Sequence, residues 1–349
     1  MNKFARILYN TNLLYKLRTC VVPKNFVFLQ CHNVHSLHKK ILVTHNLQTS
    51  KRLIKSEAKT VLAISLLTWL GFVEDDKDKE SELIMTLKRA VLCMQRDQHE
   101  KAEQMLHLAL RIAQQQQHEQ GVLYCFDLMA NLAFEQHELD KAHKLFVHVL
   151  QMLLAKGTAQ DDIKVIHISL KLARIYQLTA ELEQAEIGYS WCLEQINKSK
   201  KTDDKDAKIL YGVINDWYAQ FLLDKNEVSK AMFHLKEAYK ICKEINTDDT
   251  EKTVLLLNDL GTTSFRADDM INAEIYLKEA VDIGKRMEDK SHLGVVHANL
   301  GLILLEKGIT DEAKKFCSEA WRLGKKYENS ESVNQANYCL DQIKLNLNK

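Results

Sequence analysis

A set of three small residues recurs six times along this chain with the same two spacings. In each set the second small residue lies twelve positions after the first, and the third lies seven positions after the second. The sets are Ala90/Ala102/Ala109, Ala130/Ala142/Val149, Ala173/Ala185/Cys192, Ala219/Ala231/Ala238, Gly261/Ala273/Ala280 and Gly301/Ala313/Ala320. Small residues let two helices approach closely, so these fixed spacings predict that one helical hairpin is repeated along the chain.

The register of these sets is that of the tetratricopeptide repeat. In that repeat the first two small residues mark the contact between helix A and helix B of one hairpin, and the third lets the next hairpin pack closely. A large apolar side chain follows the helix B small residue by four positions in five of the six sets, and Cys317 takes that place in the sixth. Successive helix B small residues are 40, 43, 46, 42 and 40 residues apart, whereas an ordinary repeat has about 34.

The composition favours an all-helical chain, because one proline and eleven glycines supply few of the turn residues that a β-sheet protein needs. We assign the extra length of each repeat to longer second helices and polar loops after them. Residues 332–347 show amphipathic spacing that predicts a last helix over the final hydrophobic face. We therefore predict an all-α, right-handed tetratricopeptide-repeat superhelix of about six hairpins with a 40-46-residue period and a C-terminal capping helix.

The first part of the chain differs in charge from the rest. Residues 1–56 contain ten Lys and Arg and no acidic residue, so 38 basic and 47 acidic residues remain and give 57–349 a net charge of 38 − 47 = −9. Apolar residues at helical spacing among the first cations are typical of a mitochondrial import leader, and we assign 1–56 to one. The acidic body lacks the clustered cations of a nucleic-acid-binding protein, so we expect no nucleic-acid partner.

An apolar stretch, VLAISLLTWLGFV at residues 61–73, lies between cations and the acidic residues 74–76. Its thirteen residues are fewer than the roughly 20 that cross a bilayer, which favours a soluble cap helix. The asymmetric charge flanks instead favour a membrane span with the repeats on the side away from the matrix. We treat 57–80 as a candidate inner-membrane anchor and 81–349 as the repeat domain.

Sequence motifs for catalysis are absent. There is no GxGxxG, GxxxxGK[ST], HExxH or GxSxG, so we expect no enzyme activity, catalytic residue, cofactor or small-molecule substrate. The eight cysteines form no CxxC pair, and three of them take helix-packing positions. We expect them to be structural thiols and predict no metal site.

The predicted binding surface is the concave face of the helix A series. Helical periodicity places the residues six and three before, and one, four and five after, each helix A small residue on that face. Asn and Gln there can bond a peptide backbone and Arg a carboxylate, which suits an extended peptide or a loop of a partner. The candidates are Tyr124, Asp127, Asn131, Phe134, His167, Leu170, Arg174, Gln177, Asp216, Gln220, Asn258, Thr262, Phe265 and Arg266.

Three runs make the resemblance to a known family specific. They are LGFVEDDKDKESELIMTLKRAVLCMQRDQHEKAEQMLHLALRIAQ, LYCFDLMANLAFEQHELDKAHKLFVHVL and ISLKLARIYQLTAELEQAEIGYSWCLEQI. Over roughly residues 70–345 the chain resembles the mitochondrial tetratricopeptide repeat protein 19 family in period, repeat order and the apolar segment before the acidic stretch. That resemblance implies an inner-membrane-associated factor that binds dimeric respiratory complex III and helps to clear fragments of the Rieske iron–sulfur protein.

Two other classes stay open at this point. A kinesin-light-chain-like cargo adaptor, or a chaperone adaptor, would also bind peptides in such a groove, although the expected N-terminal heptads are missing from residues 1–80. An enzyme on a helical scaffold would need convergent acid, base or metal groups, and the scattered His and Cys residues show no such spacing.

Overall fold

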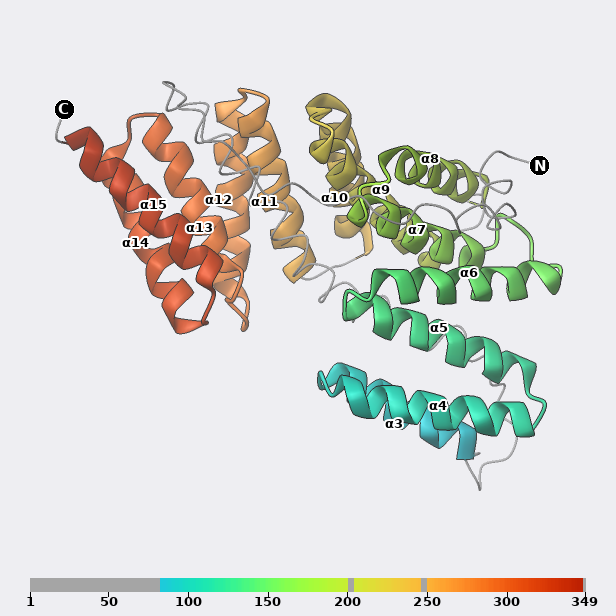
Figure 1. The fold of residues 1–349 in the computed structure, drawn as a ribbon. Coiled ribbons are helices and arrows are strands. Elements are labelled where there is room, and N and C mark those ends of the chain that lie inside the picture. Colours follow the sequence, from blue (N-terminus) through green and yellow to red (C-terminus); the bar gives the residue numbers. More distant parts are fainter. Residues whose placement is uncertain (1–81, 200–203, 246–249, 348–349) are drawn as a thin grey trace, which may run out of the picture. The chain divides into compact units, whose positions relative to one another are not determined.

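The computed structural model describes residues 82–199, 204–245 and 250–347, and within them the regular structure is helical (Figure 1). The described part contains thirteen helices. They are α3 (Glu82–Gln95), α4 (His99–Gln115), α5 (Glu119–Glu135), α6 (Leu139–Ala155), α7 (Ile163–Leu178), α8 (Leu182–Ser199), α9 (Lys205–Asp224), α10 (Val228–Ile245), α11 (Glu251–Arg266), α12 (Met270–Arg286), α13 (Leu293–Glu306), α14 (Thr310–Lys326) and α15 (Ser330–Leu347).

These helices form the predicted hairpins and the predicted cap, so the all-α tetratricopeptide-repeat fold is confirmed. Helices of 14 to 20 residues account for most of the long period. The described chain divides into two compact units, one ending at Ala207 and the other beginning at Lys208. The first unit contains α3 to α8, and the second contains nearly all of α9 together with α10 to α15.

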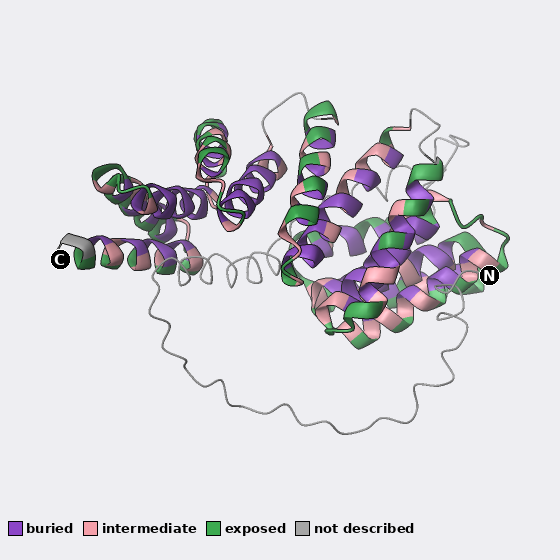
Figure 2. Cartoon of the chain, turned by 90° about the horizontal axis from the view of Figure 1, so that it is seen from above, coloured by how far each residue is buried: buried purple, intermediate pink, exposed green. Residues whose placement is uncertain are grey.

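The repeated small residues lie in the interior of each unit. All eighteen are buried, and the first two of every set are completely inaccessible where they are alanine. Figure 2 shows the result as buried faces that the helices turn toward one another, with exposed residues on the outer faces. At Gly301 an added Cβ would collide with the Cys317 sulfur, so the last hairpin requires glycine at its closest approach.

One turn type joins helix A to helix B in all six hairpins. The residue five positions before the helix B small residue has a positive φ, between 56° and 76°, at Asp97, His137, Ala180, Asn226, Asp268 and Gly308. At the third of these turns the Ala180 amide donates to the Gln177 carbonyl at 3.1 Å and the Glu181 amide to the Tyr176 carbonyl at 2.8 Å. These bonds satisfy the last carbonyls of helix A, which is how a left-handed residue ends a helix.

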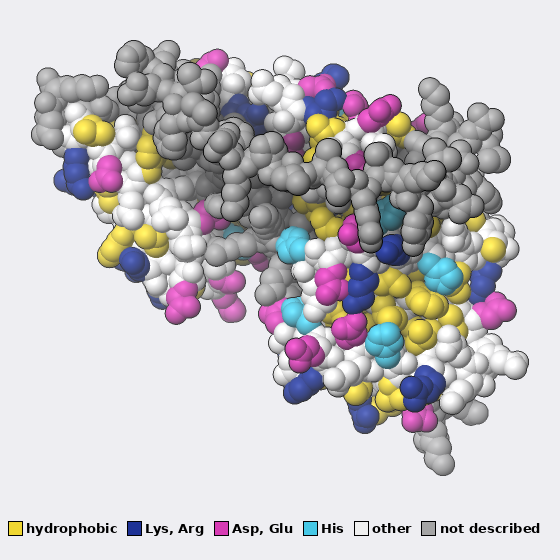
Figure 3. Space-filling view, in the orientation of Figure 1, with side chains coloured by type: hydrophobic (Ala, Val, Ile, Leu, Met, Phe, Trp, Pro, Cys, Tyr) yellow, Lys and Arg dark blue, Asp and Glu magenta, His cyan; other side chains and the backbone are white. Residues whose placement is uncertain are grey.

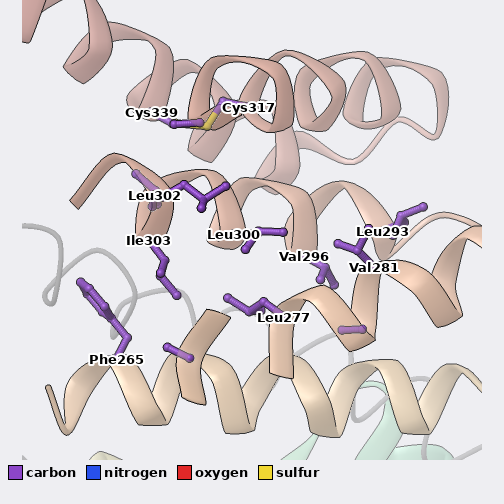
Figure 4. Packing of buried hydrophobic residues seen from close by; sticks show 14 of the residues in the cluster. Phe265, Leu277, Val281, Leu293, Val296, Leu300, Leu302, Ile303, Cys317 and Cys339 are labelled. Atoms are coloured by element: carbon purple, nitrogen blue, oxygen red, sulfur yellow. A yellow bond between two sulfur atoms is a disulfide. The ribbon is translucent and has the colours of Figure 1, made fainter. Parts of the chain in front are cut away.

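The cysteines differ from the prediction at one place. Cys317 of α14 and Cys339 of α15 form a disulfide with Cα atoms 6.2 Å apart (Figure 4), so the expectation of structural thiols is wrong for these two. They are 22 positions apart, and they meet only because the capping helix packs on the last hairpin. Cys93, Cys125 and Cys192 are free thiols.

Two predicted segments fall outside the described residues: the import leader 1–56 and the candidate anchor 57–80. Within the described ranges, no helix combines the length and the apolar character that a bilayer span requires.

Candidate partner-binding surface

The predicted surface residues lie on α5, α7, α9 and α11, the first helices of repeats two to five. The helices carry them at the expected positions, yet most of the side chains are covered. Nine of the thirteen candidates other than Leu170 are buried: Tyr124, Asn131, Phe134, Arg174, Asp216, Gln220, Asn258, Thr262 and Phe265. Leu170 is buried too, and the remaining Asp127, His167, Gln177 and Arg266 are half-buried.

Asn131 links two neighbouring repeats in the first unit. Its Nδ2 donates to the Asp127 backbone carbonyl at 2.7 Å, and its Oδ1 accepts from Lys171 Nζ of α7 at 2.6 Å. The Lys171 ammonium also lies 5.2 Å from the centre of the Phe146 ring. A buried ammonium needs such partners, because an unpaired charge in the interior is costly.

Burial dominates the electrostatics around Lys171. It lowers the pKa of Lys171, against the attraction of Asp127 and Glu135, and it raises the pKa of Asp127, against the attraction of Lys171 and the hydrogen bond from Asn131. The pKa of His167 falls well below its usual value because of burial and then the nearby Lys171. His167 is therefore neutral at physiological pH and can act as a hydrogen-bonding group, not as a cation.

Gln177 organises the other end of the α7 face. Its Oε1 accepts from Arg174 Nη1 at 2.9 Å and from the Tyr189 hydroxyl of α8 at 2.7 Å. Phe134 of α5 packs edge-on against Phe146 of α6, with ring centres 6.3 Å apart. The Gln177–Tyr189 and Phe134–Phe146 contacts each join helix A to helix B within one hairpin. Gln177 and Phe134 therefore help to hold their hairpins together.

The second unit repeats the polar link seen at Asn131. Gln220 Nε2 of α9 donates to Asp259 Oδ2 of α11 at 2.8 Å, and Lys252 Nζ donates to Asp216 Oδ2 at 2.6 Å. Burial and then the neighbouring Asp216 raise the pKa of Asp259 to about 7. A carboxyl with that pKa exchanges its proton near neutral pH, unlike an exposed aspartate.

The series continues toward α13. Asn299 Nδ2 donates to Asn258 Oδ1 at 2.8 Å, and the Thr262 hydroxyl donates to the Asn258 backbone carbonyl at 3.0 Å. Arg266 Nη2 donates back to the Leu223 carbonyl and to Asn226 Oδ1, both at 3.1 Å. Arg266 therefore caps the end of α9 in the preceding repeat.

The helical spacing used to select the candidate surface did not select three residues that hydrogen-bond to it from the next repeat: Lys171, Asp259 and Asn299. All three lie two positions before the helix A small residue of their repeat. In two repeat pairs that residue bonds the residue one position after the preceding small residue, as Lys171 with Asn131 and Asp259 with Gln220. A polar residue at both positions of adjacent repeats is the signal that could have identified the pairs.

The side chains of the candidate surface are suited to hydrogen bonding. In the part of the chain that the structure describes, no group of three His, Cys, Asp or Glu could hold a metal ion. The polar pairs fix the register between helices, since each satisfies a buried group of the next repeat. The half-buried Asp127, His167, Gln177 and Arg266 are the candidates that retain access to a partner.

Comparison with curated proteins finds extended similarity. Tetratricopeptide repeat protein 19 homolog, mitochondrial, of Drosophila melanogaster is 39% identical over 288 residues, which cover 82% of this chain and 78% of the relative. The human tetratricopeptide repeat protein 19, mitochondrial, is 34% identical over 273 residues, which cover 74% and 72% of the two chains. No protein-family model matches the chain.

Solved structures share the fold at low identity. BtubC from P. vanneervenii superimposes with a TM-score of 0.55 at 16% identity, over 72% of this chain and 94% of BtubC. A signal-transduction ATPase with a tetratricopeptide-repeat sensor from Pyrococcus horikoshii gives a TM-score of 0.57 at 16% identity, over 86% of this chain and 42% of the ATPase. These likenesses concern the arrangement of helices alone.

Proposed function

Because the chain belongs to the tetratricopeptide repeat protein 19 family, we propose that it is a non-enzymatic mitochondrial scaffold of the respiratory chain. It associates with the inner membrane, binds assembled dimeric complex III and promotes the clearance of Rieske iron–sulfur protein fragments. Its partners are proteins, with no nucleic acid, cofactor or small-molecule substrate.

The observation that carries this proposal is similarity to curated relatives over most of the length of both chains. The relatives are named mitochondrial proteins, and the acid-free leader expected for residues 1–56 agrees with import. A tetratricopeptide-type array supplies extended helical surfaces and few reactive groups, which suits holding a protein more than transforming a substrate.

We place the partner contact on the α5 and α7 face, at the half-buried Asp127 and His167. Asp127 offers a carboxylate and His167 a neutral ring, both suited to hydrogen bonding an extended backbone. Asn131 of α5 accepts a hydrogen bond from Lys171 of α7 and is therefore a supporting residue. Substituting Asn131 would disturb the packing as well as the surface, so it is a poor test of binding.

The test uses mitochondria that lack the chain and are re-supplied with wild type, with Asp127→Asn/His167→Ala, or with the control Asp140→Asn/His107→Ala. The control changes the same residue types at exposed positions of α6 and α4. Immunoprecipitation measures captured complex III, and immunoblotting measures Rieske fragments. We expect the surface variant to lose about tenfold or more of the captured complex, as for a desolvated polar contact, and to accumulate fragments.

Capture equal to that of the control would refute the surface assignment, provided that both variants melt at the wild-type temperature. Capture of no complex III by the wild-type chain would refute the function itself. Recovery of the wild-type chain in the cytosol with other cargo would favour the adaptor class.

A further inference from the structure

The outer face of α14 carries a concentration of cations around an exposed tryptophan. Trp321 is 42% exposed. Around it, from the second turn of α14 to its end, lie the exposed side chains of Lys314, Lys315, Arg322, Lys325 and Lys326. Figure 3 shows basic and acidic side chains interspersed over the face that it displays. We call the set of these six residues the α14 basic face.

The fold leaves this face in solvent for a simple geometric reason. On its other side α14 buries Ala313, Cys317, Ala320, Leu323 and Gly324 against its neighbours. Because each helical residue advances about 100°, Trp321, Lys314 and Lys325 lie about 90–130° around the helix from the middle of that buried stripe, and Lys315, Arg322 and Lys326 lie about 130–170° from it. The basic face is therefore not used in holding the array together.

Acidic partners neutralise little of the face. Glu319 binds Arg322 through two bonds, from Nε at 2.7 Å and Nη2 at 2.6 Å. Among the described residues, no acidic side chain forms an ion pair with Lys314, Lys315, Lys325 or Lys326. Lys325 instead lies 5.6 Å from the centre of the Trp321 ring. By contrast, Lys141 in the first unit pairs with both Glu103 and Glu138.

We propose that the α14 basic face docks on the surface of an anionic lipid bilayer. Charge complementarity favours this occupant, because phosphate headgroups attract clustered cations by an amount that grows with their number. Tryptophan settles at the boundary between headgroups and acyl chains, and long lysine stems reach from there into water. Lysine is depleted at protein–protein interfaces, whereas four of the five cations here are lysine, so a protein partner fits less well.

The clustered cations and the exposed tryptophan act together in membrane binding. A few cations or one aromatic ring alone give weak, reversible membrane binding, and their combination gives a defined orientation. The net charge of −9 derived above for residues 57–349 repels an anionic surface as a whole, so only a local basic face can approach it. This docking rests on the inner-membrane association proposed above, and it does not depend on the binding of complex III.

The experiment compares three full-length proteins on two kinds of vesicle. The vesicles are phosphatidylcholine alone, and phosphatidylcholine with about a quarter phosphatidylserine to give the negative surface potential. The face variant is Lys314→Gln/Lys325→Gln. The matched control is Lys236→Gln/Lys240→Gln, which removes the same charge from exposed positions of α10 in the same unit. Residues 1–81 are identical in all three, so any lipid affinity of their own cancels in the comparison.

Sedimentation with the anionic vesicles should show a roughly thirtyfold smaller partition coefficient for the face variant and less than about a threefold change for the control. The difference should vanish at about 0.5 M salt because of screening. The fluorescence of Trp321 reports insertion directly. The part of the tryptophan emission that disappears in Trp321→Phe belongs to Trp321, and brominated acyl chains of anionic vesicles should quench that part.

Equal losses by the face variant and the control would overturn the proposal, as would a Trp321 emission that brominated lipid leaves unchanged. Normal vesicle binding by the face variant, combined with loss of its complex III on native gels, would assign the face to a protein partner and also overturn it. Normal vesicle binding by wild type with no complex III bound would leave the lipid assignment standing and refute only the proposed function.

Discussion

Replacing Ala180 by glycine tests the turn geometry, because the sign of the change in unfolding free energy depends on it. Ala180 is exposed and has a φ of 63°, a conformation that an L-residue with a Cβ adopts at a cost of about 1–2 kcal/mol. Glycine avoids this cost but adds unfolded-state entropy worth about 0.4–1 kcal/mol. The Ala180→Gly variant should therefore raise the free energy of unfolding of the first unit by about 0.5–1 kcal/mol.

Gly308 provides the matched reverse substitution at the same register position of the last hairpin. Its φ is 76°, and a Cβ added there would meet no atom within 4 Å. The Gly308→Ala variant should then lose about 0.5–1 kcal/mol, which is the backbone strain less the entropy that alanine removes from the unfolded state.

Urea unfolding followed by far-ultraviolet circular dichroism measures both changes, with hydrogen exchange at the turn amides to assign them to the correct unit. If residue 180 were an ordinary helical position, glycine would instead destabilise by about 1 kcal/mol. A loss of stability in Ala180→Gly would refute the shared turn geometry.

Three further predictions concern buried contacts. Reduction of Cys317–Cys339, or replacement of both by Ser, should destabilise the end of the array by about 3 kcal/mol for a 22-residue separation, and a thermal shift on adding dithiothreitol should be absent from the double variant. Because the pKa of Asp259 in the folded state is about 7 and thus raised, the folded state binds an extra proton between about pH 4 and pH 7. Stability should therefore rise as pH falls from about 8 to 5, by on the order of 2 kcal/mol, and Asp259→Asn should flatten this rise in urea titrations. A double-mutant cycle of Asn131→Ala and Lys171→Met should give a coupling of about 1–2 kcal/mol; additive losses would show that the 2.6 Å bond contributes nothing.

The fold could be predicted because its information is periodic. A small residue is required wherever two helix axes come close, so the same requirement reappears in every hairpin and spacing alone reveals it. The turn residues were less visible, since the left-handed position is glycine only at Gly308 and is filled elsewhere by residues such as Ala180 and Asn226.

The candidate surface was harder to predict, because helical periodicity tells which residues share a face but not how deeply each is covered. Asn131 and Gln220 lie on the predicted face, yet their polar atoms bond the next repeat. Those bonds depend on the offset between adjacent hairpins, which no single repeat encodes. The disulfide between Cys317 and Cys339 was missed for the same reason, since it depends on how the cap meets the last hairpin.

Native electrophoresis of gently solubilised mitochondria, with immunodetection of this chain and of complex III, tests the proposed function directly. We expect the chain to migrate with the assembled dimeric complex. Migration of the chain apart from complex III, under conditions in which the dimer stays intact, would contradict it.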